Sequence, residues 1–218
     1  DEDAIGGIML TSSHNPAEYL GVKLRMADGG AAGKEFTDRV EAVLPDAATA
    51  ERGACEEADL MTAYLDALKR RVDVGAIRNA NLRVVVDPLY GIPGGVSMNN
   101  PLGLPIYFGI VALRDLGVEV CEINNAEDPT FDGLHPEPIP PWVDRCIAKV
   151  PELGYDAGFI NDGDADRIGA VDEHGNFVNP HRIITLLVQH MVEDRHESGR
   201  VVSTITASAC PEPAVEFA

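Results

Sequence analysis

Positive charge is scarce in this sequence. Lys and Arg together number 17 among 218 residues, against 36 Asp and Glu, which gives a formal net charge of −19 at pH 7. A chain this acidic is repelled by the phosphates of nucleic acid and by anionic membrane surfaces. We therefore expect neither nucleic acid nor a membrane among its partners.

Long hydrophobic runs and paired cysteines are also absent from the sequence. No apolar run approaches the roughly 20 residues that a membrane-spanning helix needs, and the first residues lack the pattern of a signal peptide. The cysteines stand far apart, without the CxxC spacing of zinc or redox motifs: Cys55, Cys121, Cys146 and Cys210. We expect reduced, mostly buried thiols in a cytoplasmic protein.

What the sequence does contain is an alternation of strand and helix patterns. Short apolar or β-branched runs predict strands at residues 4–10, 20–26, 82–86, 118–123, 155–160, 168–172 and 200–206. Helical spacing predicts helices at residues 33–44, 57–73, 104–116, 141–150 and 179–196. This alternation predicts an α/β protein in which helices are layered over a sheet.

The same patterns predict which side chains face a core. The apolar strand at residues 4–10 is most simply a buried one. In the helix at residues 33–44 the inward positions are Phe36, Val40, Val43 and Leu44. In the helix at residues 179–196 they are Ile184, Leu187, Val188 and Met191, while the histidines on or near polar positions are expected at the surface: His181, His190 and His196.

Three aspartates alternate in the segment Asn161-Asp162-Gly163-Asp164-Ala165-Asp166-Arg167, between two apolar runs. Oxygen ligands packed this closely suit a hard divalent cation such as Mg²⁺. Without a cation the three charges repel one another. The segment therefore predicts a metal site, with a solvated acidic turn between two strands as the alternative.

An EF-hand calcium loop is a further alternative for the same segment. Counted from Asp162, acids fall at positions one, three and five, and Glu173 falls at position twelve. However, position six is Arg167, where the sharp bend of an EF-hand needs glycine, and both flanks have strand patterns where helices are required. These departures exclude the calcium loop.

A second polar segment, Thr11-Ser12-Ser13-His14-Asn15-Pro16, follows the first predicted strand. Asn-Pro is a turn signal, so an ordinary polar turn is one interpretation. The other is a serine nucleophile displayed at the end of a strand. His14 is too close in sequence to serve easily as the base of such a serine. The next predicted strand alternates, which places Lys23 and Arg25 on one face.

These two segments resemble motifs of the α-D-phosphohexomutases. In that family the serine loop has the pattern Thr-Ala-Ser-His-Asn-Pro followed by Asn-Gly-Ile-Lys, and the metal loop resembles residues 162–167. The order and separation of the two motifs fit, and the resemblance covers nearly the whole chain. The departures are Ser12 for the usual Ala, Leu20 for Asn and Val22 for Ile.

The resemblance implies a role for each matching residue. Ser13 would carry a phosphoryl group, and its phosphate would join Asp162, Asp164 and Asp166 as a ligand of Mg²⁺. Arg167 would stabilise charge on the transferring phosphoryl group, Lys23 would be a general acid/base, and His14 a supporting contact. Lys23 and Arg167 also supply the local positive field that an anionic substrate needs in so acidic a chain.

The resemblance also implies an architecture and a reaction. It implies layered α/β/α domains with mixed sheets: residues 1–77 as the C-terminal part of a phosphoserine domain, 78–198 as a metal-binding domain, and 199–218 as the start of a third. The substrate would be a hexose phosphate, with a glucose 1,6-bisphosphate-type activator. The chain begins with Asp-Glu-Asp instead of Met, and we expect an incomplete fragment, inactive alone, that exposes the strand at residues 4–10.

Several assignments stay open at this stage. The sugar could be glucose, mannose or glucosamine, and a non-catalytic module that binds a divalent metal or a sugar phosphate is the alternative of a different class. The glycine-rich segment at residues 90–95 lacks the GK[ST] of a P-loop and is taken as structural. Residues 96–103 are a possible insertion, and His135, a lone histidine in a Pro-rich loop, is not expected to be a ligand.

Overall fold

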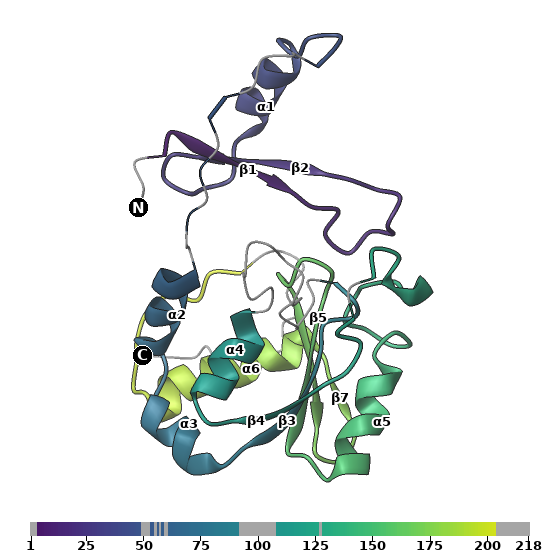
Figure 1. The fold of residues 1–218 in the computed structure, drawn as a ribbon. Coiled ribbons are helices and arrows are strands. Elements are labelled where there is room, and N and C mark those ends of the chain that lie inside the picture. The colour runs from purple at the N-terminus through teal and green to yellow at the C-terminus, as the bar shows by residue number, and fades with distance from the viewer. Residues whose placement is uncertain are drawn as a thin grey trace.

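The computed structural model describes residues 4–48, 53–54, 56, 58, 61–91, 108–126 and 128–203. Its strands form two separate sheets (Figure 1). A two-stranded antiparallel hairpin joins β1 (Gly6–Leu10) to β2 (Val22–Met26) and is followed by α1 (Lys34–Glu41). The larger sheet has five strands in the order β4-β3-β5-β6-β7.

The five-stranded sheet is mixed, as predicted. The central strand β3 (Arg83–Asp87) pairs in parallel with β4 (Glu119–Glu122) on one side and with β5 (Ala157–Asn161) on the other. From β5 the chain returns antiparallel through β6 (Ile168–Asp172) to β7 (Phe177–Val178). The segment between β5 and β6 is the acidic loop, which therefore emerges beside the carboxyl end of β3.

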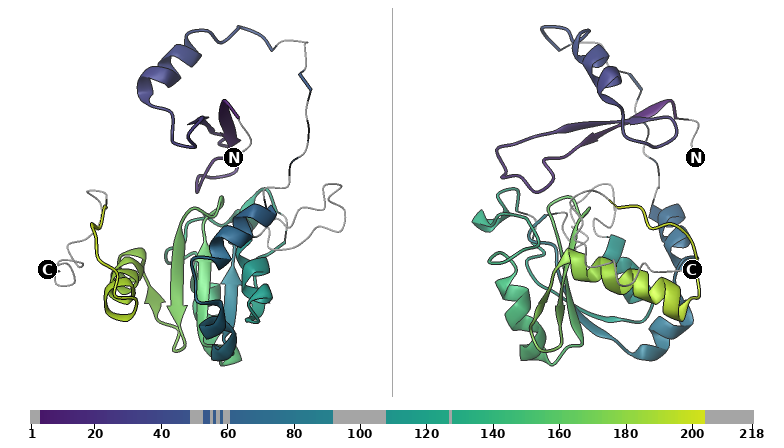
Figure 2. Two further views of the ribbon diagram at one scale, coloured as in Figure 1. Left: turned by 90° about the vertical axis from the view of Figure 1, so that its left-hand side faces the viewer. Right: turned by 180° about the vertical axis from the view of Figure 1, so that it is seen from behind.

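Helices cover both faces of this sheet, so the predicted layered architecture is confirmed (Figure 2). On one face α5 (Asp144–Leu153) packs through Cys146 and Val150 against Val85 of β3. On the other face Val84 and Val86 pack with Ile110 of α4 (Phe108–Asp115). Because successive residues of a strand face opposite sides, the run of three valines serves both cores.

Three further α-helices and a short 3-10 helix at Phe131–Gly133 belong to the described part of the chain. The α-helices are α2 (Met61–Lys69), α3 (Val74–Ala80) and α6 (Pro180–Gln189), and a π-helical turn over His190–Asp194 extends the last one. Asn179 caps α6 by accepting a hydrogen bond from the Arg182 N–H at 3.0 Å, and Pro180 is its first residue. The predicted start of this helix is therefore confirmed.

Some predicted boundaries are wrong. The helix expected over residues 57–73 ends at Lys69, because the Asp73 side chain accepts from Ala76 N–H at 2.8 Å and so begins the separate helix α3. The helix expected over residues 141–150 begins only at Asp144. Residues 200–203 are not in a strand. The short strand β7 was not predicted, and residues 204–206, the segment 92–103, Cys55 and Cys210 lie outside the described residues.

The predicted burial of three elements is also wrong. All of β1 is exposed, Ile8 to 72%, which matches the other expectation, that of an exposed first strand. Helix α1 buries no residue, and Phe36, Val43 and Leu44 are exposed. Helix α6 likewise buries none, and Ile184, Leu187 and Met191 are exposed. Periodicity identified an apolar face in each helix, but no residue of either helix is buried, although α6 lies beside β6.

Two further expectations concern cysteines and membranes. Cys121 and Cys146 are free thiols, and Cys146 is buried. Within the described ranges, no helix is both long enough and apolar enough to cross a bilayer.

Candidate functional site

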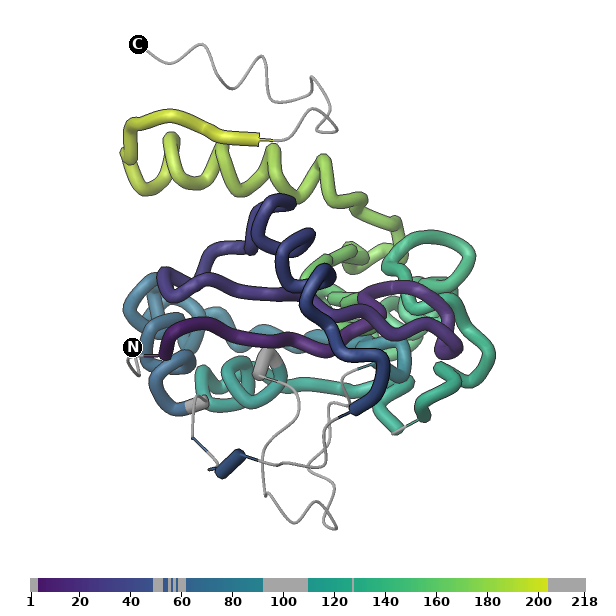
Figure 3. The backbone as a smooth tube through the Cα atoms, turned by 90° about the horizontal axis from the view of Figure 1, so that it is seen from above, coloured from purple at the N-terminus to yellow at the C-terminus, as the bar shows by residue number. Residues whose placement is uncertain are grey.

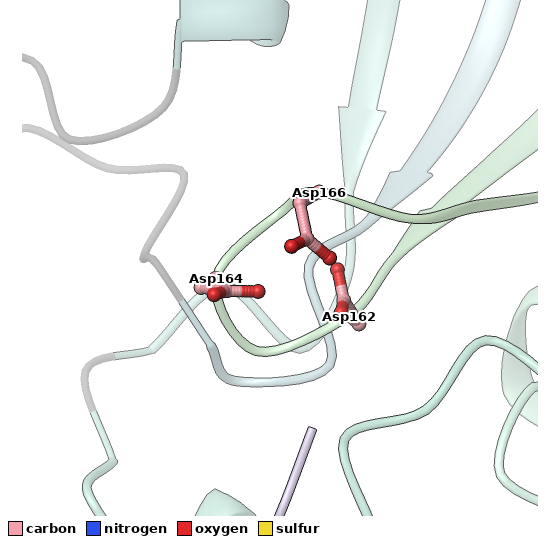
Figure 4. A group of neighbouring side chains, drawn as sticks. All are labelled: Asp162, Asp164 and Asp166. Carbon is pink, nitrogen blue, oxygen red and sulfur yellow. The ribbon is translucent and has the colours of Figure 1, made fainter. Parts of the chain in front are cut away.

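The acidic loop places its three aspartates around one point (Figure 4). One carboxylate oxygen from each of Asp162, Asp164 and Asp166 lies within 4.8 Å of the others. Their burial is graded, since the Asp162 side chain is 0% exposed, that of Asp164 5% and that of Asp166 53%. A solvated acidic turn does not describe this loop, because two of its three carboxylates are removed from water.

These carboxylates suit a hard cation. Oδ2 of Asp162 and Oδ1 of Asp164 are buried and have no hydrogen-bond partner among the described residues. A buried carboxylate oxygen without a hydrogen bond raises the free energy of the folded protein. A bound Mg²⁺ would remove this cost, because Mg²⁺ prefers oxygen ligands. The residues present therefore fit a divalent cation held between them.

The surroundings shift the pKa values of the two buried aspartates in opposite directions. Burial, with the nearby charges of Asp166 and Asp164, raises the pKa of Asp162 to about 6, although its Oδ1 accepts the Arg167 backbone N–H at 2.9 Å. Burial also opposes ionisation of Asp164, but hydrogen bonds from Thr11 and Lys23 and the charge of Lys23 outweigh it and lower the Asp164 pKa. Asp164 is thus held ionised by residues of the hairpin.

The serine loop lies between β1 and β2. Thr11 and Gly21 exchange two backbone hydrogen bonds of 3.0 Å, which close its base. Within it, Ser13 N–H donates to the Thr11 hydroxyl at 2.9 Å, and Asn15 N–H donates to the Ser12 carbonyl at 3.0 Å. Ser13 has a φ of 56°, a left-handed conformation that is strained for a residue other than glycine.

The hairpin and the sheet meet at the acidic loop. The Thr11 hydroxyl donates to Asp164 Oδ2 at 2.9 Å across 153 positions of sequence. Lys23 Nζ lies 3.3 Å from the same oxygen and 3.7 Å from Asp166 Oδ2. Viewed from above the hairpin, β1 and β2 cross over the end of the sheet from which this loop emerges (Figure 3).

Ser13 itself lies against Gly163, the residue between the first two aspartates. A Cβ atom placed on Gly163 would come within 2.5 Å of the Ser13 carbonyl oxygen. The close approach of the two loops therefore requires glycine at this position. The structure brings the serine loop, Lys23 and the three aspartates together.

Arg167 also lies beside the aspartates. Its Nη1 lies 3.2 Å from Glu137 Oε1, and its Nε lies 3.8 Å from Asp162 Oδ2 and 4.0 Å from Asp166 Oδ1. Glu137 was not predicted from the sequence, where its only signal is its place in the Pro-rich loop after His135. A hollow of about 400 Å³ begins at Asp166 and Arg167 and continues between Ile168 and Ile183.

His14 reaches a neighbour that the sequence did not predict. Its ring centroid lies 6.0 Å from that of His135, which stacks in turn on Trp142 at 6.0 Å. Among the described residues, the aspartates are the only group of three or more potential metal ligands, and His135 is not part of it. The surface positions predicted for His181, His190 and His196 are confirmed.

Comparisons with known proteins agree with this geometry. Residues 1–51 match the family model for phosphoglucomutase/phosphomannomutase, alpha/beta/alpha domain I, and residues 62–175 match that for alpha/beta/alpha domain II. A phosphoglucomutase/phosphomannomutase of Thermococcus kodakarensis is 34% identical over 211 residues, covering 94% of this chain and 43% of the relative. A protein of Methanothermobacter thermautotrophicus assigned as a phosphoglucosamine mutase is 30% identical over 212 residues, covering 95% of this chain and 42% of the relative.

Solved structures give the same result. A protein of Thermus thermophilus assigned as a phosphomannomutase superposes with a TM-score of 0.82 at 34% identity, covering 99% of this chain and 48% of that one. The chain therefore spans less than half the length of these relatives.

Proposed function

Because the chain belongs to the phosphoglucomutase/phosphomannomutase family, we propose that it is part of a Mg²⁺-dependent phosphohexomutase. This enzyme would interconvert hexose 1-phosphate and hexose 6-phosphate, of glucose or mannose, through a phosphoserine at Ser13. One observation carries the proposal: the strand and loop that hold Ser13 bond directly to the acidic loop, through Thr11 and Lys23 to Asp164.

The aspartates and the Arg167 side chain would have different roles in phosphoryl transfer. Asp162, Asp164 and Asp166 would hold Mg²⁺, which when bound neutralises charge on the phosphoryl oxygens. Arg167 is kept beside this point by Glu137, at 3.2 Å, and would meet the same charge with its guanidinium. The site can thereby attract an anionic sugar although the chain as a whole is acidic.

The transfer would proceed at Ser13. The hydroxyl oxygen of the sugar phosphate forms a bond to phosphorus while the bond from phosphorus to Ser13 Oγ breaks. The sugar hydroxyl gives up its proton and Oγ gains one, and Lys23 is the candidate to move a proton at the sugar hydroxyl. The bisphosphate formed returns its other phosphoryl group to Ser13 by the reverse steps, so that a hexose 1,6-bisphosphate also serves as the activator.

We further propose the domain division given by the sequence, with one adjustment. The sheet that carries the acidic loop begins at Arg83, which supports a second unit from about residue 78 to residue 198. Val74 and Ile77 of α3 pack against the core of that sheet, so this unit extends back to include α3. Residues 199–218 would begin a third unit.

This chain by itself would not turn over at the rate of a whole enzyme. Because it spans less than half the length of its relatives, the groups that hold the far phosphate of the substrate would lie outside it. Orientation of both ends of a substrate supplies much of the rate of such a reaction. A coupled assay that found ordinary enzyme turnover by the 218-residue chain would contradict this proposal.

Phosphate incorporation tests the proposed function against a non-catalytic binding module. The protein is incubated with glucose 1,6-bisphosphate and Mg²⁺, and its peptides are analysed by mass spectrometry. We expect phosphate on Ser13, none in Ser13→Ala, and continued incorporation in Ser12→Ala. A binding module would take up no phosphate in any of the three, and phosphate on Ser12 in the Ser13→Ala variant would reverse the assignment of the nucleophile.

A second candidate concerns the sugar alone. Relatives assigned as phosphoglucosamine mutases are 30% identical to this chain, close to the 34% of the phosphoglucomutase/phosphomannomutase relative. Incubation with glucosamine 1,6-bisphosphate in a parallel experiment separates the two. Faster phosphorylation of Ser13 from the glucosamine compound would favour the second candidate.

A further inference from the structure

A buried acid outside the acidic loop begins a network that the proposed chemistry does not use. Asp87, the last residue of β3, is fully buried. One of its oxygens accepts the Leu89 backbone N–H at 2.9 Å, and both accept from the Asn124 side-chain amide, each at 3.0 Å. The carboxylate therefore ties the turn that follows β3 to the segment that follows β4.

The network continues outward to the surface of α5. Arg145 Nη1 donates to the Asn124 side-chain oxygen at 2.7 Å and to the Tyr90 hydroxyl at 2.9 Å. Tyr90 N–H donates to the Asn124 carbonyl at 2.9 Å, and its hydroxyl donates to Asp132 at 3.2 Å. Tyr90 is thus held at both its backbone and its side chain.

These bonds hold a strained turn. Leu89 and Tyr90, two consecutive residues with side chains, have φ values of 49° and 56°, in the left-handed region. Such a conformation persists only where the surroundings determine it, and strained segments of this kind gather at functional sites. The hydrogen bonds that the turn donates to Asp87 and Asn124, and the one it accepts from Arg145, provide that determination.

The turn ends against the acidic loop. A Cβ atom placed on Gly91 would lie 2.7 Å from both the Cα and the carbonyl oxygen of Gly163, which are backbone atoms and cannot swing aside. Gly163 stands between Asp162 and Asp164, and its own N–H donates to the Pro136 carbonyl at 3.1 Å. The turn at Gly91 therefore packs directly against the backbone between the two buried aspartates.

We propose that Asp87, Asn124 and Arg145 are positioning residues for the metal site, because they hold the turn whose Gly91 sets the acidic loop in place through Gly163. The inference rests on the proposed function, since it requires that the aspartates bind Mg²⁺. None of the three residues binds the ion in this scheme. They act through the backbone of the loop that does, as outer partners do when they orient metal ligands.

Calorimetric titration of the protein with Mg²⁺ alone tests the inference, with the dissociation constant as the readout. Gly91→Ala forces the two backbones apart, and we expect Mg²⁺ affinity to fall about 10- to 100-fold, the range typical of lost outer-shell support. Gly33→Ala is the matched control, because a Cβ atom there meets nothing within 4 Å. Its affinity should equal that of the unsubstituted protein.

A second variant, Arg145→Met, tests the inference if Gly91→Ala does not fold. This side chain is 58% exposed, so Arg145→Met leaves the core intact. We expect about tenfold weaker Mg²⁺ binding in Arg145→Met. Partial recovery is expected in Arg145→Lys, because an ammonium group lacks the planar fork that reaches Asn124 and Tyr90 together.

The outcomes separate the inference from the proposed function. Unchanged Mg²⁺ affinity in Gly91→Ala and Arg145→Met, with lowered thermal stability, would make the network merely structural and overturn the inference alone. Absence of Mg²⁺ binding in the unsubstituted protein would overturn the metal site of the proposed function, and the inference with it. Weakened binding in Arg145→Met with recovery in Arg145→Lys supports both.

Discussion

The hairpin of β1 and β2 and the five-stranded sheet are held in place by different forces. The sheet has two cores of fully buried side chains, one on each face. The hairpin strands bury no side chain, and the hairpin is joined to the sheet unit by polar and close-packed contacts at the acidic loop and by the ring contact of His14 with His135. Burial therefore stabilises the sheet, whereas the candidate site itself determines where the hairpin lies.

The largest expected difference between the two regions is in stability. Ile160→Ala, in the core of the sheet, should lower the free energy of unfolding by about 2–5 kcal/mol, because Ile160 is 0% exposed. The same substitution at the exposed Ile8 should cost less than about 0.5 kcal/mol. Urea denaturation of the two variants makes the comparison. Equal losses would show that the hairpin is covered in solution.

The sheet region should also carry a pH dependence of its own. Burial raises the pKa of Asp87 from its ordinary 3.8 to about 6. Between pH 4 and 6 the folded protein therefore keeps a proton that the unfolded chain has lost, and the free energy of unfolding falls as pH rises through this window, by up to about 3 kcal/mol. Below pH 4 Asp87 is protonated in both the folded and the unfolded protein, so it no longer lowers the free energy of unfolding.

Asp87→Asn isolates this contribution. Urea unfolding between pH 4 and 7, with EDTA present, should show a flatter decline of stability in the variant than in the unsubstituted protein. Asp162, whose pKa is also raised to about 6, contributes with the same sign, so some slope should remain. An identical pH profile in the variant would mean that Asp87 is not the titrating group.

A substitution at Asp164, where the hairpin contacts the acidic loop, is expected to change the dissociation constant for Mg²⁺. Asp164→Asn removes one charge from the group of aspartates and should weaken Mg²⁺ binding at least about tenfold. Asp38→Asn is the control, since Asp38 lies on the exposed helix α1 and pairs there with Lys34. Calorimetric titration gives both dissociation constants, and equal affinities in the two variants would place the ion elsewhere.

The smallest expected effect concerns the attachment of the hairpin. Thr11→Val removes the hydrogen bond to Asp164 and the acceptor of Ser13 N–H, each a bond of about 0.5–1.5 kcal/mol. Amide hydrogen exchange should accelerate at residues 6–26 and stay unchanged in β3. The control is Thr37→Val, whose hydroxyl donates to the Lys34 carbonyl within α1. Uniform acceleration across both regions would show that the hairpin and the sheet do not open independently.

The sequence predicted local structure well where one short pattern determines it. Val84, Val85 and Val86 indicated a buried strand and Asn179-Pro180 a helix start, and both lie as expected. The alternating aspartates indicated a set of oxygen ligands, and one oxygen of each lies within 4.8 Å of the others. Burial was predicted poorly for Phe36 and Leu187, because periodicity shows which face of a helix is apolar and not whether anything covers it.

Contacts between distant segments were the other failure. Glu137 beside Arg167, His135 beside His14, and Gly91 against Gly163 all join positions that lie far apart in the chain. A motif comparison identifies the ligands, but it carries no information on the residues that hold them. The close approach of Gly91 and Gly163 follows only from how the turn after β3 is folded.

The two carboxylate oxygens of Asp164 have different surroundings. Oδ2 accepts from Thr11 and Lys23 of the hairpin, while Oδ1 is buried without a hydrogen-bond partner among the described residues. One carboxylate charge is thus shared between the attachment of the hairpin and whatever binds at Oδ1. By thermodynamic reciprocity, a ligand that changes the strength of the hairpin contact has its own affinity changed by the same factor when that contact is altered. Docking of the hairpin and occupancy of the aspartates are therefore expected to be coupled, each changing the free energy of the other by the same amount.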